Sequence, residues 1–182
     1  MNIYNMFSNK KRALVLKKIL AKSGVFTIAG IAEECGVSKS FVSVIMASMK
    51  GEKMATRRGR NFSLSLCAKT RAARIFLSLS EIDARLFRKY PFVEAAGIYG
   101  SVAKGENTED SDIDMWLVIG SAPEGTIARL SMQLRERLGP VKPLYLTKER
   151  LARIRTEDPL FYHSLCFGSI IIYGDGIESP RV

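Results

Sequence analysis

The sequence predicts an α+β chain with two domains: a helical N-terminal domain that ends in a hairpin, and a C-terminal α/β domain with a small mixed sheet. Three observations predict this division. Residues 1–90 carry 18 Lys and Arg against 5 Asp and Glu, whereas residues 91–182 carry 10 against 13. Apolar residues recur at helical spacing in the first part and form short runs between turn residues in the second. Between these parts, residues 68–90 contain neither Gly nor Pro.

Composition narrows the class of protein. A hydrophobic content of 47% and a charged content of 25% are typical of a globular chain that buries a core. No apolar run approaches the roughly 20 residues that span a bilayer. The N-terminal "MNIYNMFSNKKR" lacks the apolar segment of a secretory signal, so we expect a cytoplasmic protein without membrane contact. The scattered Cys35, Cys67 and Cys166 predict small buried residues, not a metal or disulfide framework.

Two short helices open the basic half. The segment "KKRALVLKKILAKSG" predicts an amphipathic helix that ends near Gly24, with its apolar side formed by Leu14, Leu16, Ile19 and Leu20. A second helix is expected from about Ile28 to Glu34. Thr27, just before it, is a suitable N-cap.

A third helix follows a tight turn at Gly36, and Ser38 is its expected N-cap. Spacing of i, i+3, i+4 and i+7 predicts a buried stripe of Val42, Ile45, Met46 and Met49. The outward face is then formed by Lys39, Ser40 and Ser43.

The segment "EKMATRRGRNFSLSL" predicts a hairpin, with a short strand, the turn "RRGR" and an alternating strand containing Phe62, Leu64 and Leu66. Three arginines lie at its tip: Arg57, Arg58 and Arg60. Clustered positive charge of this kind suits phosphate groups or the minor groove of a nucleic acid.

Residues 1–67 resemble the winged helix-turn-helix domain of transcription regulators. Three positions carry the resemblance: a small Ala32 where two helices touch, Gly36 in the turn, and the β-branched Val42. The resemblance implies double-stranded DNA as a partner, with the third helix and its Lys39, Ser40 and Ser43 in the major groove. The alternative is a helical packing module with a solvated basic face.

Residues 68–90 predict a single linker helix that ends before Pro91, because their apolar residues fall near helical spacing. Its apolar stripe could pack on either domain or on a second copy of the chain. We expect a homodimer on this basis.

Residues 91–182 alternate between strand and helix patterns. Strands are expected at "FVEAAGIYGS", "DIDMWLVIG" and "PVKPLYLT", and a last strand or helix end at "SIIIYG". Helices are expected at "TIARLSMQLRERLG", "TKERLARIR" and "DPLFYHSLCFG". This order predicts a small mixed sheet with helices against it.

Between the first two of these strands lies "GSVAKGENTEDSDID". Gly100 in a turn lets backbone amides approach an anion closely. Asp112 and Asp114 in an extended segment send both carboxylates to one face. This stretch lacks residues that the Walker, dinucleotide-binding and EF-hand patterns each require. A solvated acidic loop at a strand edge is the alternative to a phosphate and metal site.

The same stretch resembles the minimal nucleotidyltransferases of the DNA polymerase beta superfamily over residues 91–176. The shared features are Gly100-Ser101, then a basic residue with Gly at Lys104-Gly105, then Ser111-Asp112-Ile113-Asp114. Lys104 stands where the family usually has Arg. The resemblance implies transfer of a nucleoside monophosphate from a nucleoside triphosphate (NTP), with Mg²⁺ or Mn²⁺ as cofactor.

The resemblance also assigns roles within this stretch. Asp112 and Asp114 are the expected metal ligands and catalytic residues. The nucleotide is expected to contact Gly100, Ser101, Lys104 and Ser111. Because minimal nucleotidyltransferases often adenylylate a partner toxin protein, a toxin-like protein is an expected acceptor.

Active relatives have a third carboxylate on the following long strand. Here that strand is "VKPLYLT", and Lys142-Pro143 occupy the expected position, while Glu149 belongs to the next helix. Loss of a carboxylate weakens metal binding and removes a candidate base. The alternative function is therefore a transcription regulator whose nucleotidyltransferase-like domain is catalytically weak or inactive and serves nucleotide sensing or dimerisation.

Overall fold

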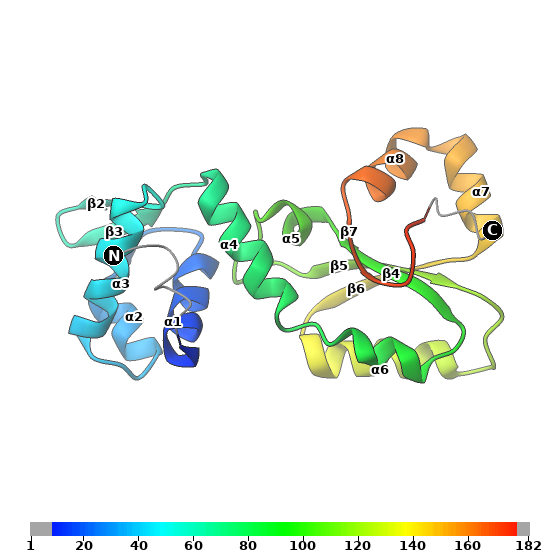
Figure 1. The fold of residues 1–182 in the computed structure, drawn as a ribbon, viewed down its shortest axis with the longest axis horizontal. Helices are drawn as coiled ribbons and strands as arrows, with labels where there is room; N and C mark the ends of the chain where they lie inside the picture. The colour runs from blue at the N-terminus through cyan, green and yellow to red at the C-terminus, as the bar shows by residue number, and fades with distance from the viewer. Residues whose placement is uncertain (1–8, 178–182) are drawn as a thin grey trace. The chain divides into compact units, whose positions relative to one another are not determined.

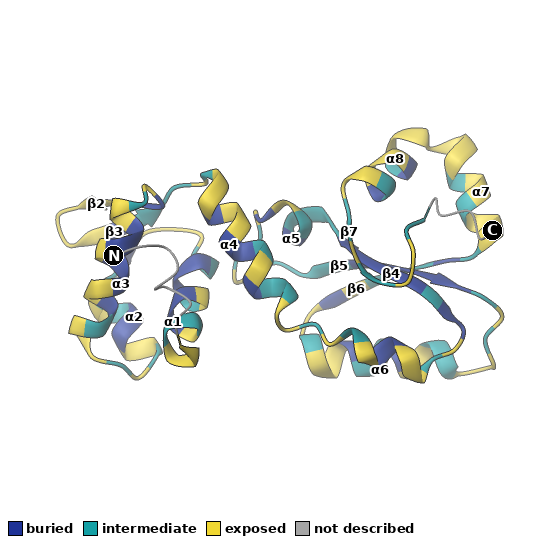
Figure 2. Ribbon diagram, viewed as in Figure 1, coloured by how far each residue is buried: buried dark blue, intermediate teal, exposed yellow. Residues whose placement is uncertain are grey.

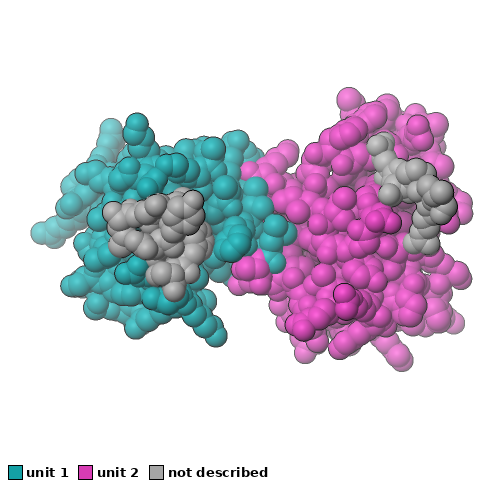
Figure 3. Space-filling model, in the orientation of Figure 1, with its two compact units in different colours: residues 1–79, 105–110 teal, residues 80–104, 111–182 magenta. Residues whose placement is uncertain are grey.

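The computed structural model describes residues 9–177, and its chain forms two compact units. Unit 1 comprises residues 1–79 and 105–110, and unit 2 comprises residues 80–104 and 111–182 (Figures 1 and 3). Both contain helices and a small sheet, so the predicted α+β class is confirmed. Within the described residues, no helix has the length and apolar character that crossing a membrane requires.

Within its described residues, unit 1 has four helices and a three-stranded antiparallel sheet with the strand order β1-β3-β2. In chain order the elements are α1 (Lys10–Ala21), β1 (Phe26–Thr27), α2 (Ile28–Glu34), α3 (Lys39–Gly51), β2 (Ala55–Arg58), β3 (Asn61–Leu64) and α4 (Ala68–Leu79). The predicted hairpin is therefore present as β2 and β3, joined by a turn at Gly59 with φ +61°.

Side-chain caps fix where the short helices begin. The Thr27 hydroxyl accepts a hydrogen bond from the Gly30 amide (3.0 Å), and the Ser38 hydroxyl accepts one from the Phe41 amide (3.2 Å). Each cap satisfies an amide that has no partner within its helix. Gly36, between α2 and α3, has a φ of +59°, which favours glycine. The predicted caps and turn are confirmed.

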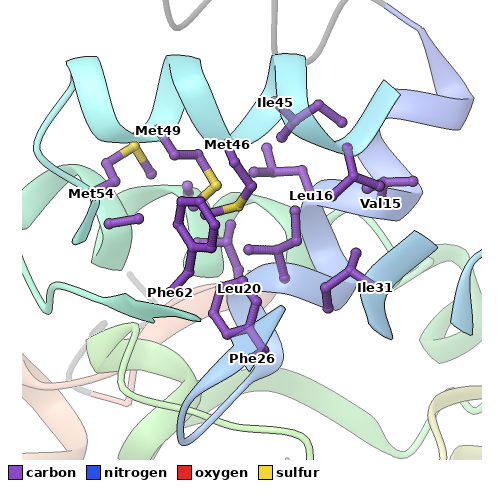
Figure 4. Close-up of a cluster of buried hydrophobic side chains, with 14 of the residues drawn as sticks. Val15, Leu16, Leu20, Phe26, Ile31, Ile45, Met46, Met49, Met54 and Phe62 are labelled. Carbon is purple, nitrogen blue, oxygen red and sulfur yellow. The ribbon is translucent and has the colours of Figure 1, made fainter. Parts of the chain in front are cut away.

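The core of unit 1 is built around α3. The predicted stripe is buried and consists of Val42, Ile45, Met46 and Met49. Figure 4 shows Met46 and Met49 beside Phe62 of β3 and Leu16 of α1. The residues predicted to face outward, Lys39, Ser40 and Ser43, are exposed. The amphipathic pattern therefore predicted the correct face of this helix.

The prediction of one linker helix over residues 68–90 is wrong. Helix α4 ends at Leu79, and a separate 3-10 helix, η2 (Ala84–Lys89), begins after Asp83. The Asp83 carboxylate caps η2 by accepting a hydrogen bond from the Arg85 amide (3.0 Å). The short Asp83 side chain provides a hydrogen-bond partner for a nearby backbone amide. This favours the start of a new helix over continuation of α4. The α4 helix belongs to unit 1, and η2 belongs to unit 2.

Residues 105–110, here called the connecting segment, are part of unit 1 although the chain on both sides of them is part of unit 2. The buried Arg74 of α4 donates through Nε to the Leu20 carbonyl (2.8 Å) and through Nη1 to the Gly105 carbonyl (3.5 Å). Burial lowers the pKa of Arg74. Gly105 has a φ of +66°, and a Cβ there would lie 2.3 Å from the carbonyl oxygen of Arg71.

Polar contacts hold the rest of the connecting segment against other residues of unit 1. The Glu109 amide donates to the Ala21 carbonyl (2.8 Å), and the Glu109 carboxylate accepts from the Lys22 ammonium (3.1 Å). Glu106 forms an ion pair with Arg71 (2.8 Å). Contacts with both α1 and α4 therefore hold this segment in unit 1.

The described part of unit 2 contains a four-stranded mixed sheet with the order β6-β5-β4-β7. Its further elements in chain order are β4 (Val93–Tyr99), α5 (Gly100–Lys104), β5 (Ile113–Ile119), α6 (Thr126–Leu138), β6 (Val141–Leu146), α7 (Lys148–Glu157), α8 (Pro159–Phe167) and β7 (Ile170–Tyr173). Strand β4 pairs antiparallel with β5 and β7, and β5 pairs parallel with β6. The predicted mixed sheet is confirmed.

Helices cover both faces of this sheet, with α6 on one side and α7 and α8 on the other (Figure 1). On the second side, Trp116 and Val118 of β5 are buried against Leu146 of β6 and Leu165 of α8. On the first side, the Tyr145 hydroxyl lies 2.7 Å from the Ser131 hydroxyl of α6. The two central strands are the most deeply buried part of unit 2 (Figure 2).

Candidate functional site

The candidate site lies where β4 ends and β5 begins. In the antiparallel register of these strands, Tyr99 is paired with Asp114, so the Gly100-Ser101 corner lies beside the start of β5. Figure 1 shows α5 at this end of the sheet. Gly100 has a φ of +70°, and a Cβ there would lie 2.4 Å from Oδ2 of Asp114. The corner and the second aspartate, which are well separated in sequence, are therefore in contact.

Strand alternation determines which way the aspartates face. Trp116 and Val118 of β5 face the buried cluster under α8. Asp114 precedes Trp116 by two positions within β5, so it belongs to this face. Asp112 lies just before the first residue of the strand. Both side chains are half-buried. Asp114 therefore has the orientation that the sequence predicted, while the shared face of the two carboxylates stays a prediction for Asp112.

Lys142 of β6 is the third charged residue of the site. The parallel register pairs it with Asp114, and its ammonium lies 2.7 Å from Oδ2 of Asp112. The pKa of Lys142 is raised, mainly by the hydrogen bond to Asp112 and by the charge of that carboxylate. The side chain stays 69% exposed. Lys142 therefore lies on the strand where the family resemblance implies a third carboxylate.

Tyr99 is a site residue that the sequence analysis missed. Its ring packs edge-on against Phe161 of α8, with ring centroids 6.3 Å apart. Burial raises the pKa of the Tyr99 hydroxyl, and the negative charge of Asp114 raises it further. Its position immediately before Gly100, at the end of an apolar strand, is the signal that could have identified it.

The remaining predicted nucleotide contacts lie around this corner. Ser101 is half-buried in the first turn of α5, and Lys104 is exposed at the end of the same helix. Ser111 is half-buried just before Asp112. The connecting segment separates Lys104 from Ser111 in sequence and belongs to unit 1. Glu149 is exposed in the first turn of α7.

The acidic groups of the site fit one divalent ion. Carboxylate oxygens are the ligands that Mg²⁺ and Mn²⁺ prefer, and Mg²⁺ commonly takes one or two carboxylates together with substrate phosphates. Within residues 9–177, no group of three or more His, Cys, Asp and Glu side chains lies close enough to bind a metal. Asp112 and Asp114 would hold the ion, with one oxygen of Asp112 already paired to Lys142.

The predicted DNA contacts all lie on the surface of unit 1. Arg57, Arg58 and Arg60 are exposed at the β2–β3 turn. Arg57 is also used inside the hairpin: its Nε donates to the Gly59 carbonyl (2.8 Å), and its guanidinium lies over the Phe62 ring (5.6 Å from the centroid). Arg58 and Arg60 are therefore the better candidates for an external anion.

Comparisons with known proteins agree with the C-terminal geometry. The model of the family described as polymerase beta, nucleotidyltransferase, matches residues 83–176, just over half of the chain. No curated protein matches the sequence. A solved structure from Sulfolobus solfataricus, provisionally titled a nucleotidyltransferase, is 20% identical, with a TM-score of 0.34. The match covers 57% of this chain and 82% of that one.

Proposed function

Because the chain belongs to the polymerase beta nucleotidyltransferase family, we propose that unit 2 binds a nucleoside triphosphate and transfers its nucleoside monophosphate to an acceptor. One observation carries the proposal: the Asp114 carboxylate lies against Gly100, and Lys142, which pairs with Asp114 in the strand register, contacts Asp112. It supports a site in which a corner that binds phosphate would lie beside two carboxylates that would hold a cation.

Each residue has a role that its position supports. The backbone amides at Gly100 and Ser101 and the Ser101 hydroxyl would bind the β- and γ-phosphates, with Lys104 adding positive charge. Asp112 and Asp114 would hold one Mg²⁺ ion, which neutralises charge that develops on the phosphate oxygens. An acceptor oxygen attacks the α-phosphorus, the bond to the β-phosphate oxygen breaks, and pyrophosphate leaves.

Transfer is tested with each of the four NTPs, labelled at the α-phosphorus, in the presence of Mg²⁺ and an extract that supplies acceptors. We expect a labelled macromolecule with the unaltered protein, and loss of the label in Asp112→Asn and Asp114→Asn. Glu136→Gln removes an exposed carboxylate of α6 and is the matched control, expected to label normally. Equal labelling by Asp114→Asn would contradict the proposed site.

A second candidate function is nucleotide sensing by a transcription regulator. The Lys142–Asp112 ion pair favours it, because a lysine replaces a carboxylate that could serve as metal ligand or base. Binding of an NTP without label transfer, together with a change in DNA affinity, would distinguish sensing from catalysis.

We further propose that unit 1 is a winged helix-turn-helix domain that binds double-stranded DNA. Its order of helix, strand, two helices and hairpin supports this, as does the exposure of Lys39, Ser40 and Ser43 on α3. The excess of Lys and Arg in residues 1–90 supplies the electrostatic attraction that such binding needs.

The double variant Arg58→Ala/Arg60→Ala is expected to weaken DNA binding and its salt dependence together. Each neutralised phosphate contributes about 0.9 to the slope of log affinity against log salt, so losing two contacts makes the slope shallower by about 2. Fluorescence anisotropy with a short duplex of mixed sequence measures this slope. Arg85→Ala/Arg88→Ala, which removes two exposed arginines of unit 2, should leave the slope unchanged. An unchanged slope in the first variant would exclude the hairpin as a contact.

A further inference from the structure

We infer that Lys142 supplies the positive charge that a second divalent ion would bring to the site, so that its ammonium binds the triphosphate of the nucleotide beside a single divalent ion. This inference rests on the proposed function of unit 2 as an NTP-binding domain. It concerns how positive charge is supplied to the phosphates, and it applies whether or not transfer follows.

The position of Lys142 is the first support. In the parallel register it lies opposite Asp114 on the neighbouring strand, and its ammonium contacts Asp112 at 2.7 Å. By alternation it belongs to the same face as Leu144 and Leu146, which pack in the cluster that contains Trp116. One lysine therefore lies next to both aspartates, on the face to which Asp114 belongs.

The charge of the site is the second support. Two carboxylates and one ammonium give Asp112, Asp114 and Lys142 a net charge of about −1 when all three are ionised. A site with three carboxylates would carry about −3 and could attract two divalent ions. A second ion at this site would meet the repulsion of the Lys142 ammonium, which is already paired with Asp112.

The donor capacity of Lys142 is the third support. A lysine ammonium has three hydrogen-bond donors and no acceptor. The contact with Asp112 uses one donor, and the 69% exposed side chain leaves the ammonium accessible to a ligand. Its flexible stem allows the charge to follow a phosphate oxygen without losing the carboxylate.

Binding measurements with and without divalent ions test the inference. Isothermal titration calorimetry is run with inorganic triphosphate and each of the four NTPs, once in Mg²⁺ and once in EDTA. The unaltered protein is expected to bind most tightly in Mg²⁺, because one divalent ion remains part of the site. Lys142→Ala is expected to lose about tenfold or more in Mg²⁺, because a hydrogen-bonded charge contact disappears. Lys142→Arg should restore most of this affinity.

A second readout does not depend on nucleotide affinity. Manganese bound per protein, counted by electron paramagnetic resonance in the presence of inorganic triphosphate, is expected to rise in Lys142→Glu relative to the unaltered protein. The variant creates the third carboxylate that this site lacks. Lys148→Ala, which removes an exposed lysine at the start of α7, is the control and should match the unaltered protein in both assays.

The outcomes separate the inference from the proposed function. If Lys142→Ala binds triphosphate in Mg²⁺ as tightly as the unaltered protein does, the inference is overturned and NTP binding stands. The inference also fails if Lys142→Glu binds no more manganese per protein than the unaltered protein does. If no triphosphate binds in either condition, both proposals fail. Circular dichroism of each variant verifies that Lys142, exposed on strand β6, can be replaced without unfolding unit 2.

Discussion

Gly100→Ala is expected to abolish detectable nucleotide binding and to lower any transfer by at least about 100-fold. The new Cβ would lie 2.4 Å from Oδ2 of Asp114, a distance at which one of the two groups must move. The φ of +70° adds a backbone cost of about 1–2 kcal/mol for a residue with a side chain. Because the carboxylate and the corner must bind the same ligand, their displacement removes the site itself.

Gly125→Ala is the matched control in the same unit. Gly125 has nearly the same φ, +72°, but a Cβ there would meet no atom within 4 Å. The control should lose about 1 kcal/mol of stability and bind nucleotide normally. Calorimetric titration with inorganic triphosphate compares the two variants. Equal binding by both would mean that the contact between Gly100 and Asp114 has no part in the function.

Gly105→Ala is expected to destabilise unit 1 by about 3 kcal/mol or more. The Cβ would lie 2.3 Å from the backbone oxygen of Arg71 and 2.6 Å from its Cα, and backbone atoms inside a packed unit cannot easily withdraw. Gly59→Ala is the control: it has a φ of +61° in the same unit but open space around the Cβ, so about 1 kcal/mol is expected.

Two optical probes make this comparison specific to one unit. Trp116, the single tryptophan, is buried in unit 2, so its fluorescence follows the unfolding of that unit. Far-ultraviolet circular dichroism follows the helices of both units. In urea titrations of Gly105→Ala, the dichroism transition should move to lower urea by more than the fluorescence transition. A similar shift for Gly59→Ala would contradict close packing of the connecting segment on α4.

Local sequence patterns predicted most of the fold. The stripe of α3, the caps at Thr27 and Ser38, and the turn at Gly36 depend on residues within a few positions of one another, so periodicity and capping rules suffice. The same rules placed Leu14 on the buried side of α1, where it is instead 57% exposed. At the edge of a helix stripe, the neighbouring elements decide burial, and sequence spacing does not contain that information.

Features that depend on contacts between residues far apart in the chain were not predicted from the sequence. The pattern of residues 68–90 contained no helix breaker, and the separate start of η2 follows from the Asp83 cap. Nothing in "GENTED" predicted that it belongs to unit 1, because its contacts with Arg74 and Lys22 join residues far apart in the chain. For the candidate site, the sequence predicted both aspartates and the lack of a third carboxylate on β6, but the pairing of Lys142 with Asp112 required the strand register.

The connecting segment has a practical consequence for dissecting this protein. No single cleavage of the chain separates the two units. Unit 2 begins at residue 80, but residues 105–110, which come later in the chain, belong to unit 1. A fragment that stops at Leu79 would lose a backbone partner of Arg74 and uncover the Arg71 backbone. A fragment that starts at Ser80 would carry Glu106 and Glu109 without their cations. Swapping or expressing either half by ordinary truncation would therefore report on a damaged protein, and point substitutions in the full chain are the sounder route.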